Sequence, residues 1–414
     1  MNAAMPLENS ASGRPLCIAL LPQGGAGWIG GELYFRHLFE ALLDHRRRHP
    51  EHPLRLVLVT ADPERLIASH GPYRQADQLV DPRPTGWRRR LSRLRHIANR
   101  LLPPALHLPG HDLTGALRRA GVDFAYPFVP RRASGGRPRG AAWIPDFQHR
   151  HLPHLFSDQE RRGRDHDHAH LAADAPEIVF SSVDAINDFQ RFYPTSPSRP
   201  HCLHFCSLPD AALWQGDPLA IQRHYHLPDR FLLCSGQFWR HKNQSLVLEA
   251  LAALQAGHPE LFVVFTGHIH DYRAPETSDR FFAAIHEQGL RQQLAVLGLI
   301  PRQHQLQLMR RCVAVLQPSL FEGWSTVVED ARALGRPIVL SNLPVHREQN
   351  PPDGLFFERH SSASLASAMA EAWQRFEAGP DPQREAEARR ASAGRLEAMA
   401  DDLIAIATAS LERS

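Results

Sequence analysis

The chain has 414 residues, of which 43% are hydrophobic and 22% charged, with a formal net charge of +3. Its length suits two domains of about 200 residues each, no apolar run reaches the roughly 20 residues that span a bilayer, and so slight a charge predicts no nucleic-acid partner. Five cysteines without a Cys-x-x-Cys pair indicate a reduced compartment, and the polar segment 1–14 lacks a signal peptide's layout, so we expect a cytoplasmic protein.

The first predicted elements are a buried strand at 16–21, a glycine-rich segment at 23–31 and an amphipathic helix. Glycines after a strand let the backbone approach an anion, so Gly25 and Gly27 are candidate phosphate donors. The same segment matches Gly-x-Gly-x-x-Gly, and Asp62 ends the next strand, which favours an alternative interpretation as an NAD-dependent oxidoreductase. A purely structural turn is a third interpretation.

The most basic segment, 83–103, has apolar residues at helical spacing and arginines on the other faces, with no acidic residue between them. This pattern predicts an amphipathic helix that lies on an anionic membrane surface. The alternative is a helix that packs on its own domain and leaves its arginines solvated. A short helix at 113–119, a strand at 123–127 and a loop rich in Gly, Arg and Pro at 131–140 follow.

A polar segment, 143–154, overlaps the end of a predicted strand at 141–144. Loops beyond the carboxyl ends of strands bind ligands in open α/β sheets. The candidates for substrate contacts are therefore Asp146, Gln148, His149 and His151. The alternative is a capping loop whose histidines are only polar filler. The histidine-rich segment 165–170 has metal-ligand spacing, but it is typical of an exposed helix, and no metal site is predicted.

The second half of the chain opens with a short apolar strand that leads into 235–243 and a helix at 244–254. Cations at this helix start suit a phosphate, since Lys242 is a compact point charge and Arg240 lies close by in the sequence. A solvated lysine at a helix start is the alternative.

Segment 318–341 combines a strand end, a loop with a glycine, a helix and a second strand. Ser325 or Thr326 can cap the helix, and the amides of its first turn form an anion site. Carboxylates beside such a site suit a sugar diphosphate, because sugar hydroxyls need acceptors. Three acids lie there: Glu322, Glu329 and Asp330. An ordinary strand–helix unit with surface acids is the alternative.

Residues 321–335 resemble the signature of retaining family-4 glycosyltransferases of the GT-B fold, in which two acids are separated by seven residues. Aligned without gaps, Glu322 takes the first position, which meets the donor sugar in that family. Asp330 takes the second, which holds the nucleotide ribose, and Glu329 is the neighbouring alternative for that role.

The resemblance extends to the family's Gly-Arg-x-x-x-x-Lys element, whose basic residues hold the diphosphate. Gly236 and Lys242 match it, while Gln237 stands at the arginine position. Segment 143–154 is similar to a feature of one bacterial subgroup, with Pro145-Asp146 where related enzymes have His-Asp. The residue chemistry and the resemblance together predict the catalytic residues Lys242, Glu322, Asp146 and His149, although the family's catalytic-site histidine does not transfer directly to this segment. They predict donor contacts from Gly25, Gly27, Gly236, Gln237, Arg240, Lys242, Gly323, Trp324, Ser325, Thr326, Glu329 and Asp330.

Strands that alternate with helices predict an α/β protein with two Rossmann-like, doubly wound domains, which the resemblance arranges across a cleft. The expected divisions are an acceptor-side domain at 1–206, a linker at 207–229, a nucleotide-sugar-binding domain at 230–390, and a helix at 391–414 that can cross back to the first domain.

The function that the resemblance implies is retaining, metal-independent hexosyl transfer in surface polysaccharide synthesis. The donor is a UDP- or GDP-sugar, the acceptor is a glycan or a lipid-linked glycan, and no cofactor is needed. We expect a cytoplasmic enzyme, with peripheral contact at the inner membrane face through 83–103. An NAD-dependent oxidoreductase and a non-catalytic nucleotide- or glycan-binding protein are the alternatives.

Overall fold

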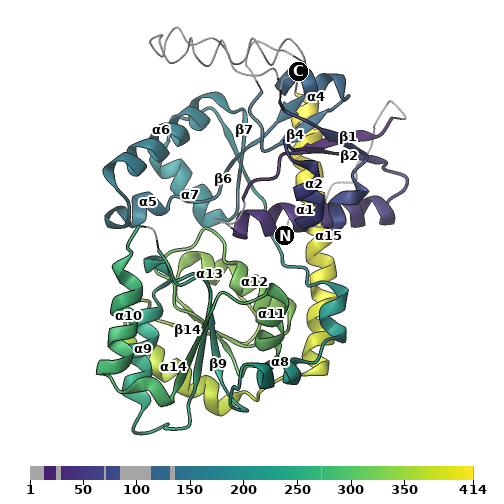
Figure 1. Ribbon diagram of the computed structural model, residues 1–414. Coiled ribbons are helices and arrows are strands. Elements are labelled where there is room, and N and C mark those ends of the chain that lie inside the picture. The colour runs from purple at the N-terminus through teal and green to yellow at the C-terminus, as the bar shows by residue number, and fades with distance from the viewer. Residues whose placement is uncertain are drawn as a thin grey trace. The chain divides into compact units, whose positions relative to one another are not determined.

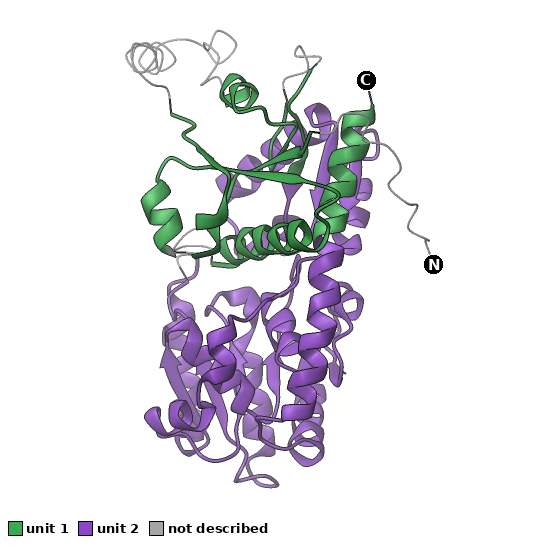
Figure 2. Ribbon diagram, turned by 90° about the vertical axis from the view of Figure 1, so that its right-hand side faces the viewer, with its two compact units in different colours: residues 1–142, 400–414 green, residues 143–399 purple. Residues whose placement is uncertain are grey.

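A computed structural model describes residues 14–24, 29–69, 71–83, 113–130, 136–271 and 273–413. The chain divides into two compact units, residues 1–142 with 400–414, and residues 143–399 (Figure 2). Gly25, Gly27 and nearly all of segment 83–103 lie outside the described residues. Within the described part of the chain, no helix combines the length and apolar character needed to cross a membrane.

The first unit contains a parallel five-stranded sheet of order β3-β2-β1-β4-β5. Its strands are β1 (Leu16–Leu20), β2 (Leu54–Val59), β3 (Gln78–Val80), β4 (Phe124–Tyr126) and β5 (Arg139–Gly140). Its helices include α1 (Ile29–Arg48), α2 (Pro63–Ser69) and α4 (Leu113–Arg119). The strand predicted at 16–21 and the helix predicted at 113–119 are confirmed. The loop predicted at 131–140 was wrong for its last two residues, because they pair with β4 as β5.

Most of the second unit surrounds a six-stranded parallel sheet of order β11-β10-β9-β12-β13-β14 (Figure 1). Its strands are β9 (Leu232–Ser235), β10 (Val263–Thr266), β11 (Leu294–Gly298), β12 (Val315–Gln317), β13 (Ile338–Ser341) and β14 (Gly354–Phe357). In such a doubly wound order, the chain turns back between its first and fourth strands, here β9 and β12. Ligands bind in open α/β sheets beyond the carboxyl ends of the strands at this switch point.

Alternate side chains of a strand point to opposite faces of the sheet. Apolar side chains therefore lie on both faces of this sheet, and helices cover both. Leu232 and Cys234 of β9 belong to the core under α9, α10 and α14, while Leu233 belongs to the core under α8, α11 and α12. The helices of this part are α8 (Pro218–His224), α9 (Gln244–Leu254), α10 (Glu276–Glu287), α11 (Arg302–Arg311), α12 (Thr326–Ala333), α13 (Pro344–Gln349), α14 (Ser362–Arg375) and α15 (Pro382–Glu412).

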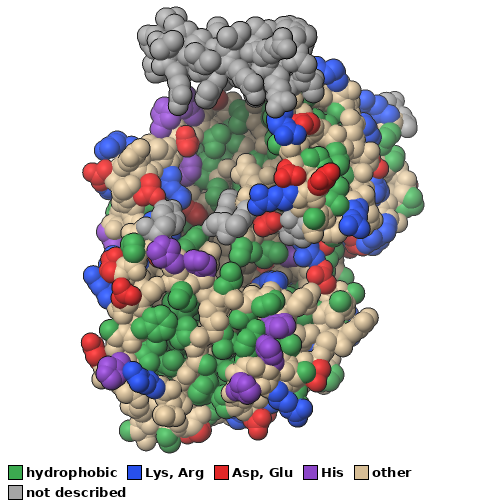
Figure 3. Space-filling view, in the orientation of Figure 1, with side chains coloured by type: hydrophobic (Ala, Val, Ile, Leu, Met, Phe, Trp, Pro, Cys, Tyr) green, Lys and Arg blue, Asp and Glu red, His purple; other side chains and the backbone are tan. Residues whose placement is uncertain are grey.

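A three-stranded sheet of order β6-β7-β8 comes before the six-stranded sheet in the chain. Its strands are β6 (Ala142–Ile144), β7 (Glu177–Phe180) and β8 (Arg199–Cys202), and its helices are α5 (Gln148–His151), α6 (Asp158–Asp174) and α7 (Val183–Phe192). Helix α6 carries the histidine-rich segment, and His166 and His170 are exposed on it, as predicted. Acidic and basic side chains are interspersed on the face in Figure 3.

The two compact units divide the chain at 142/143 and 399/400. The predicted domain boundary at 206 stays a prediction. The predicted linker at 207–229 contains α8, and the buried Leu213 joins the core beside it. Helix α15 contributes its residues from 400 onward to the first unit, where His45 Nδ1 lies 2.9 Å from Asp401 Oδ1.

Gly267, directly after β10, supports the loop that follows β9. A Cβ atom on Gly267 would lie 2.0 Å from the Gly236 carbonyl oxygen, and its φ is +131°. We expect Gly267→Ala to lower the free energy of unfolding by about 2–4 kcal/mol, measured by urea titration, through strain and displacement of that loop. Gly257→Ala is the matched control, because a Cβ there meets no atom within 4 Å. Equal stability of the two variants would contradict this account of the loop.

Candidate functional site

The centre of the candidate site is an ion pair between Lys242 and Glu322. Lys242 ends a single 3-10 turn (Arg240–Lys242) in the loop after β9, and Glu322 lies in the loop after β12. The Lys242 Nζ atom is 2.7 Å from Glu322 Oε1, although the residues are 80 positions apart. Because β9 and β12 are hydrogen-bonded neighbours, their carboxyl ends bring the two loops together at the switch point.

Glu322 is held as an ionised acceptor. Its Oε1 atom accepts hydrogen bonds from Gln317 Nε2 at 2.8 Å and from Ser319 Oγ at 2.6 Å, besides the one from Lys242. Burial is the largest single influence and raises the pKa of this carboxyl group, since only 8% of the side chain is exposed. The charge and hydrogen bond of Lys242, together with the nearby His241 and His346, outweigh burial, and the pKa falls to about 2. Glu322 therefore accepts hydrogen bonds at neutral pH and does not supply a proton.

Two buried histidines lie near this pair. Burial, with the Lys242 charge adding to it, lowers the pKa of His241 to about 3; burial likewise lowers that of His346 to about 4. His346 Nδ1 lies 2.8 Å from the Ser341 carbonyl oxygen, to which it donates, whereas its Nε2 atom has no hydrogen-bond partner among the described residues. Both rings are thus neutral at pH 7.

Lys242 is the only lysine in the 414 residues, so arginine supplies every other side chain among the 47 Lys and Arg residues. A guanidinium group is planar and forked, whereas an ammonium group is a compact point charge. The chain uses arginine in place of lysine everywhere else, and its one lysine is the residue whose ammonium group is hydrogen-bonded to Glu322. This composition singles out Lys242 without any motif.

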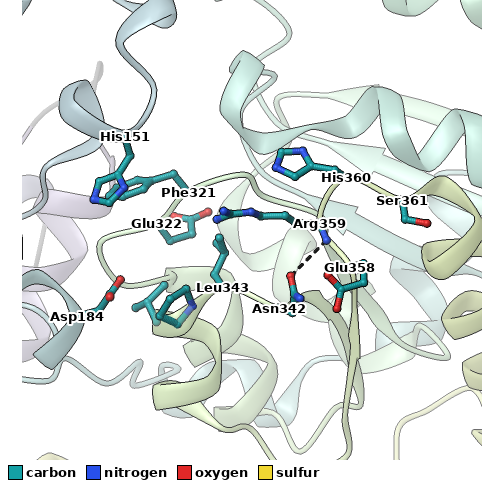
Figure 4. A pocket seen from close by; sticks show the side chains of 12 residues that line it. His151, Asp184, Phe321, Glu322, Asn342, Leu343, Glu358, Arg359, His360 and Ser361 are labelled. Atoms are coloured by element: carbon teal, nitrogen blue, oxygen red, sulfur yellow. Dashed lines mark hydrogen bonds between the residues drawn. The ribbon is translucent and has the colours of Figure 1, made fainter.

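A cavity of about 610 Å³ opens at the carboxyl ends of β12, β13 and β14 (Figure 4). Its lining residues include His151 from α5, Asp184 from α7, Phe321 and Glu322 after β12, Asn342 after β13, and Arg359 after β14. Glu322 and His151 are sequence-predicted candidates that line it, and Lys242 is hydrogen-bonded to Glu322.

Asp146 lies next to the loop after β12, and its predicted role in substrate contact stays a prediction. A Cβ atom on Gly323 would lie 2.4 Å from the Pro145 carbonyl oxygen and 2.9 Å from Asp146 Cβ, so glycine permits the close approach. The Asp146 Oδ1 atom accepts from the Gln148 amide at 2.8 Å, which fixes the start of α5.

His149 does not face the cavity. Its side chain is 1% exposed, and its Nε2 atom lies 2.9 Å from Asp165 Oδ1 of α6. The cavity is lined by His151, two residues further along α5 and therefore on another side of it. The His151 Nε2 atom is 2.5 Å from Asp188 Oδ2, which raises the pKa of His151, and its ring centroid is 5.0 Å from that of Phe321.

The start of α12 is closed by protein groups. Ser325, rather than Thr326, is the N-cap, and its hydroxyl accepts from the Val328 amide at 3.4 Å. The Ser325 amide donates to Gln349 Oε1 at 3.3 Å. Trp324 stacks on His204 at 4.4 Å and donates to the Phe205 carbonyl oxygen at 2.8 Å.

The two acids inside α12 are both buried and both paired with arginine. Glu329 binds Arg395 of α15 and accepts from Gln349 Nε2 at 2.9 Å. Asp330 binds Arg302, the first residue of α11, and accepts from Ser207 Oγ at 2.6 Å. Helix α11 also bonds the end of β9, through Gln305 to the Ser235 hydroxyl. Asp330 therefore lies on the side of the β9 loop, and Glu329 on the side of α15.

The remaining predicted donor contacts lie in the loop after β9. Gly236 has a φ of +149°, and its amide donates to the Thr266 carbonyl oxygen at 2.9 Å. The Gln237 carbonyl oxygen accepts from Gln244 Nε2 at 3.0 Å. The Arg240 amide donates to Asp271 Oδ2 at 2.9 Å, while residue 240 is exposed.

One cluster has metal-ligand chemistry, and it lies outside the predicted site. Ligand atoms of Cys202, His204 and Glu348 lie within 4.8 Å of one another. The Glu348 carboxylate is already committed to protein donors, because it accepts from the Val183 and Asp184 amides at 2.7 and 3.1 Å and bonds His204 at 2.7 Å.

Sequence reasoning missed Asn342 and Arg359, because it did not predict β14. The signal was present: an apolar run at 354–357 precedes Glu358 and Arg359 directly, so these polar residues follow a strand end. Polar side chains after β13 and β14 then belong to the same sheet edge as Glu322.

Comparison with known proteins decides the fold. Residues 222–387 match the family model described as glycosyl transferases group 1. Among curated proteins, none matches the chain. HepE of Anabaena, solved with UDP and glucose, is 16% identical with a TM-score of 0.60, over 95% of this chain and 100% of that chain.

Two further solved structures are similar. The sucrose-phosphate synthase of Thermosynechococcus elongatus is 15% identical with a TM-score of 0.59, over 96% of this chain and 100% of that one. The α,α-trehalose-phosphate synthase (UDP-forming) of Burkholderia vietnamiensis is 14% identical with a TM-score of 0.58, over 97% and 100%. The predicted α/β fold of the GT-B type is confirmed.

The neutral histidines predict acid sensitivity. The pKa of His346 is about 4 against an ordinary 6.5, so the unfolded chain binds more protons between these pH values and stability falls as the pH drops through them. From pH 7 to pH 5, we expect His346 alone to lower the free energy of unfolding by about 2 kcal/mol. Urea titrations at both pH values should show a smaller decline for His346→Gln. His166→Gln, on the exposed face of α6, should keep the wild-type decline, and an unchanged decline in His346→Gln would contradict the prediction.

Proposed function

We propose that the chain is a glycosyltransferase that moves a sugar from a nucleotide-diphosphate sugar to an acceptor hydroxyl, with retention of the anomeric configuration. The observation that carries the proposal is the Lys242–Glu322 ion pair at the switch point of the six-stranded sheet. Both residues lie within the segment that matches the glycosyl transferases group 1 model. A buried cation and a buried carboxylate suit the two halves of such a donor, its diphosphate and its sugar.

Lys242 would stabilise the leaving diphosphate. As the bond between the anomeric carbon and the phosphate oxygen breaks, negative charge develops on that oxygen, and a preorganised cation lowers the barrier. The Lys242 side chain is 19% exposed and its ammonium is held in place by Glu322, so little reorganisation is needed. This cation makes a metal ion unnecessary in the proposal, and no cofactor is invoked.

Glu322 would accept hydrogen bonds from hydroxyls of the donor sugar. Because its pKa is about 2, it stays ionised throughout, and it takes no part as a general acid. The acceptor oxygen forms the new bond to the anomeric carbon, and its proton passes to the phosphate oxygen that leaves. The proton thus passes from the acceptor hydroxyl to the leaving phosphate of the donor, and Glu322 does not carry it.

The nucleotide would lie on the β9 side, with its ribose at Asp330. Asp330 is favoured over Glu329 because its partner helix, α11, also bonds the end of β9. The similar HepE structure contains UDP and glucose, and we extend UDP to this chain as the first donor nucleotide to test. Residues 230–390 would form the nucleotide-sugar-binding domain.

We further propose a glycan or lipid-linked acceptor, used in surface polysaccharide synthesis by a cytoplasmic enzyme. The arginine-rich segment 83–103 would then hold the enzyme at the inner membrane face. This part of the proposal is supported by the family resemblance and by charge pattern alone. It is separable from the assignment of the donor site.

The first test is donor binding and donor cleavage by the whole chain. We expect UDP or GDP to raise the melting temperature, since a ligand that binds only the folded state stabilises it. One of UDP-glucose, UDP-galactose, UDP-N-acetylglucosamine and GDP-mannose should release its nucleoside diphosphate in an enzyme-coupled assay. Stabilisation by NAD, with none by UDP or GDP, would favour the oxidoreductase and defeat the proposal.

The second test uses variants of the ion pair. Lys242→Ala and Glu322→Gln should each lower the rate of diphosphate release by roughly 100- to 1,000-fold. Lys242→Arg should also be impaired, because a guanidinium group does not reproduce a compact ammonium. Arg280→Ala on α10 and Glu371→Gln on α14 are matched surface controls and should keep the wild-type rate. Wild-type rates in Lys242→Ala would remove this residue from the site.

A further inference from the structure

Arg359 lies at the cavity on the loop that follows β14, and nothing in the family signature points to it. Its side chain lines the cavity and extends across it toward Glu322 (Figure 4). The residue is half-buried, with Glu358 and His360 exposed on either side of it. A guanidinium group with five donors therefore points at the candidate site from the loop after β14.

The backbone of Arg359 is fixed on both sides of the residue. Its amide donates to Asn342 Oδ1 at 3.3 Å, in the loop after β13. Its carbonyl oxygen accepts from Asn243 Nδ2 at 3.4 Å. Because Asn243 is the residue after Lys242, this contact ties the Arg359 loop to the Lys242 loop.

The part of the chain that the structure describes offers no carboxylate to balance the charge of Arg359. Among the described residues, no carboxylate forms an ion pair with its guanidinium group, in contrast to Arg302 and Arg395, which pair with Asp330 and Glu329. Glu322, toward which it points, already receives three hydrogen bonds on Oε1 and is paired with Lys242. A half-buried cation that faces a cavity without a partner lacks an anion.

We propose that Arg359 binds the β-phosphate of the donor, the phosphate that is bonded to the sugar. This inference rests on the proposed function. Lys242 and Arg359 would approach the diphosphate from two loops, and the Asn243 contact keeps those loops together. The loop after β9 has an uncharged side chain at Gln237, and its Arg240 is exposed, so Arg359 would add a half-buried second cation for the diphosphate. Guanidinium groups bind phosphate oxygens in a bidentate manner, which suits this role.

The test is calorimetric titration of the whole chain with UDP, UMP, GDP and GMP. Wild type should bind one diphosphate, and Arg359→Ala should weaken that binding by about 10- to 100-fold, the loss of a charge-assisted hydrogen bond. Binding of the corresponding monophosphate should change by less than about 3-fold, because it lacks the β-phosphate. Arg359→Lys keeps the charge without the fork and should lie between the two. Arg280→Ala should match wild type.

Each outcome has one meaning. If wild type binds no nucleoside diphosphate, the proposed function fails, whatever Arg359 does. If wild type binds and Arg359→Ala binds equally well, the Arg359 assignment is overturned and the donor site stands. Equal weakening for the diphosphate and the monophosphate also overturns the β-phosphate assignment. Melting temperatures within about 2 °C of wild type show that Arg359→Ala and Arg359→Lys are folded. A change of about 1 kcal/mol in the free energy of unfolding would already give a detectable shift in melting temperature.

Discussion

The ion pair between Lys242 and Glu322 is the constraint on which the rest of the site depends. Two unit charges at 2.7 Å are held in a largely buried place, and such a pair is stable only when neighbouring groups satisfy the remaining hydrogen bonds. Gln317 and Ser319 do so for the carboxylate. The order of strands makes the pair possible, because β9 and β12 are neighbours in the sheet although a whole strand–helix series separates them along the chain.

The buried titratable groups near the ion pair are either neutral or paired with an opposite charge. His241 and His346 are neutral, since burial lowers both pKa values far below 7. Asp330 and Glu329 are each neutralised by an arginine. The buried layer under the cavity is thus close to neutral overall, so a bound anion would be attracted mainly by the cations at the cavity surface. This distribution separates the groups that build the site from those free to meet a ligand.

The sequence predicted several regular elements of the second half, because strands there are short apolar runs. The helix predicted at 244–254 has the bounds of α9. Lys242 and Glu322 were found through motifs tied to strand ends. The orientation of α5 was not legible, because which of His149 and His151 faces the cavity depends on how a single helical turn packs against α6 and α7. Arg359 was missed along with β14, because the short apolar run at 354–357 was not interpreted as a strand.

The solitary lysine has a practical consequence for anyone who handles this chain. A protease that cleaves only after lysine has one bond to cut, between Lys242 and Asn243, and the cut separates β9 from β12. Lys242 ends a 3-10 turn and is hydrogen-bonded to Glu322. Cleavage therefore requires the turn to move away from the Glu322 carboxylate. The rate at which the intact chain becomes two fragments therefore measures how often the centre of the site opens, without any engineered label.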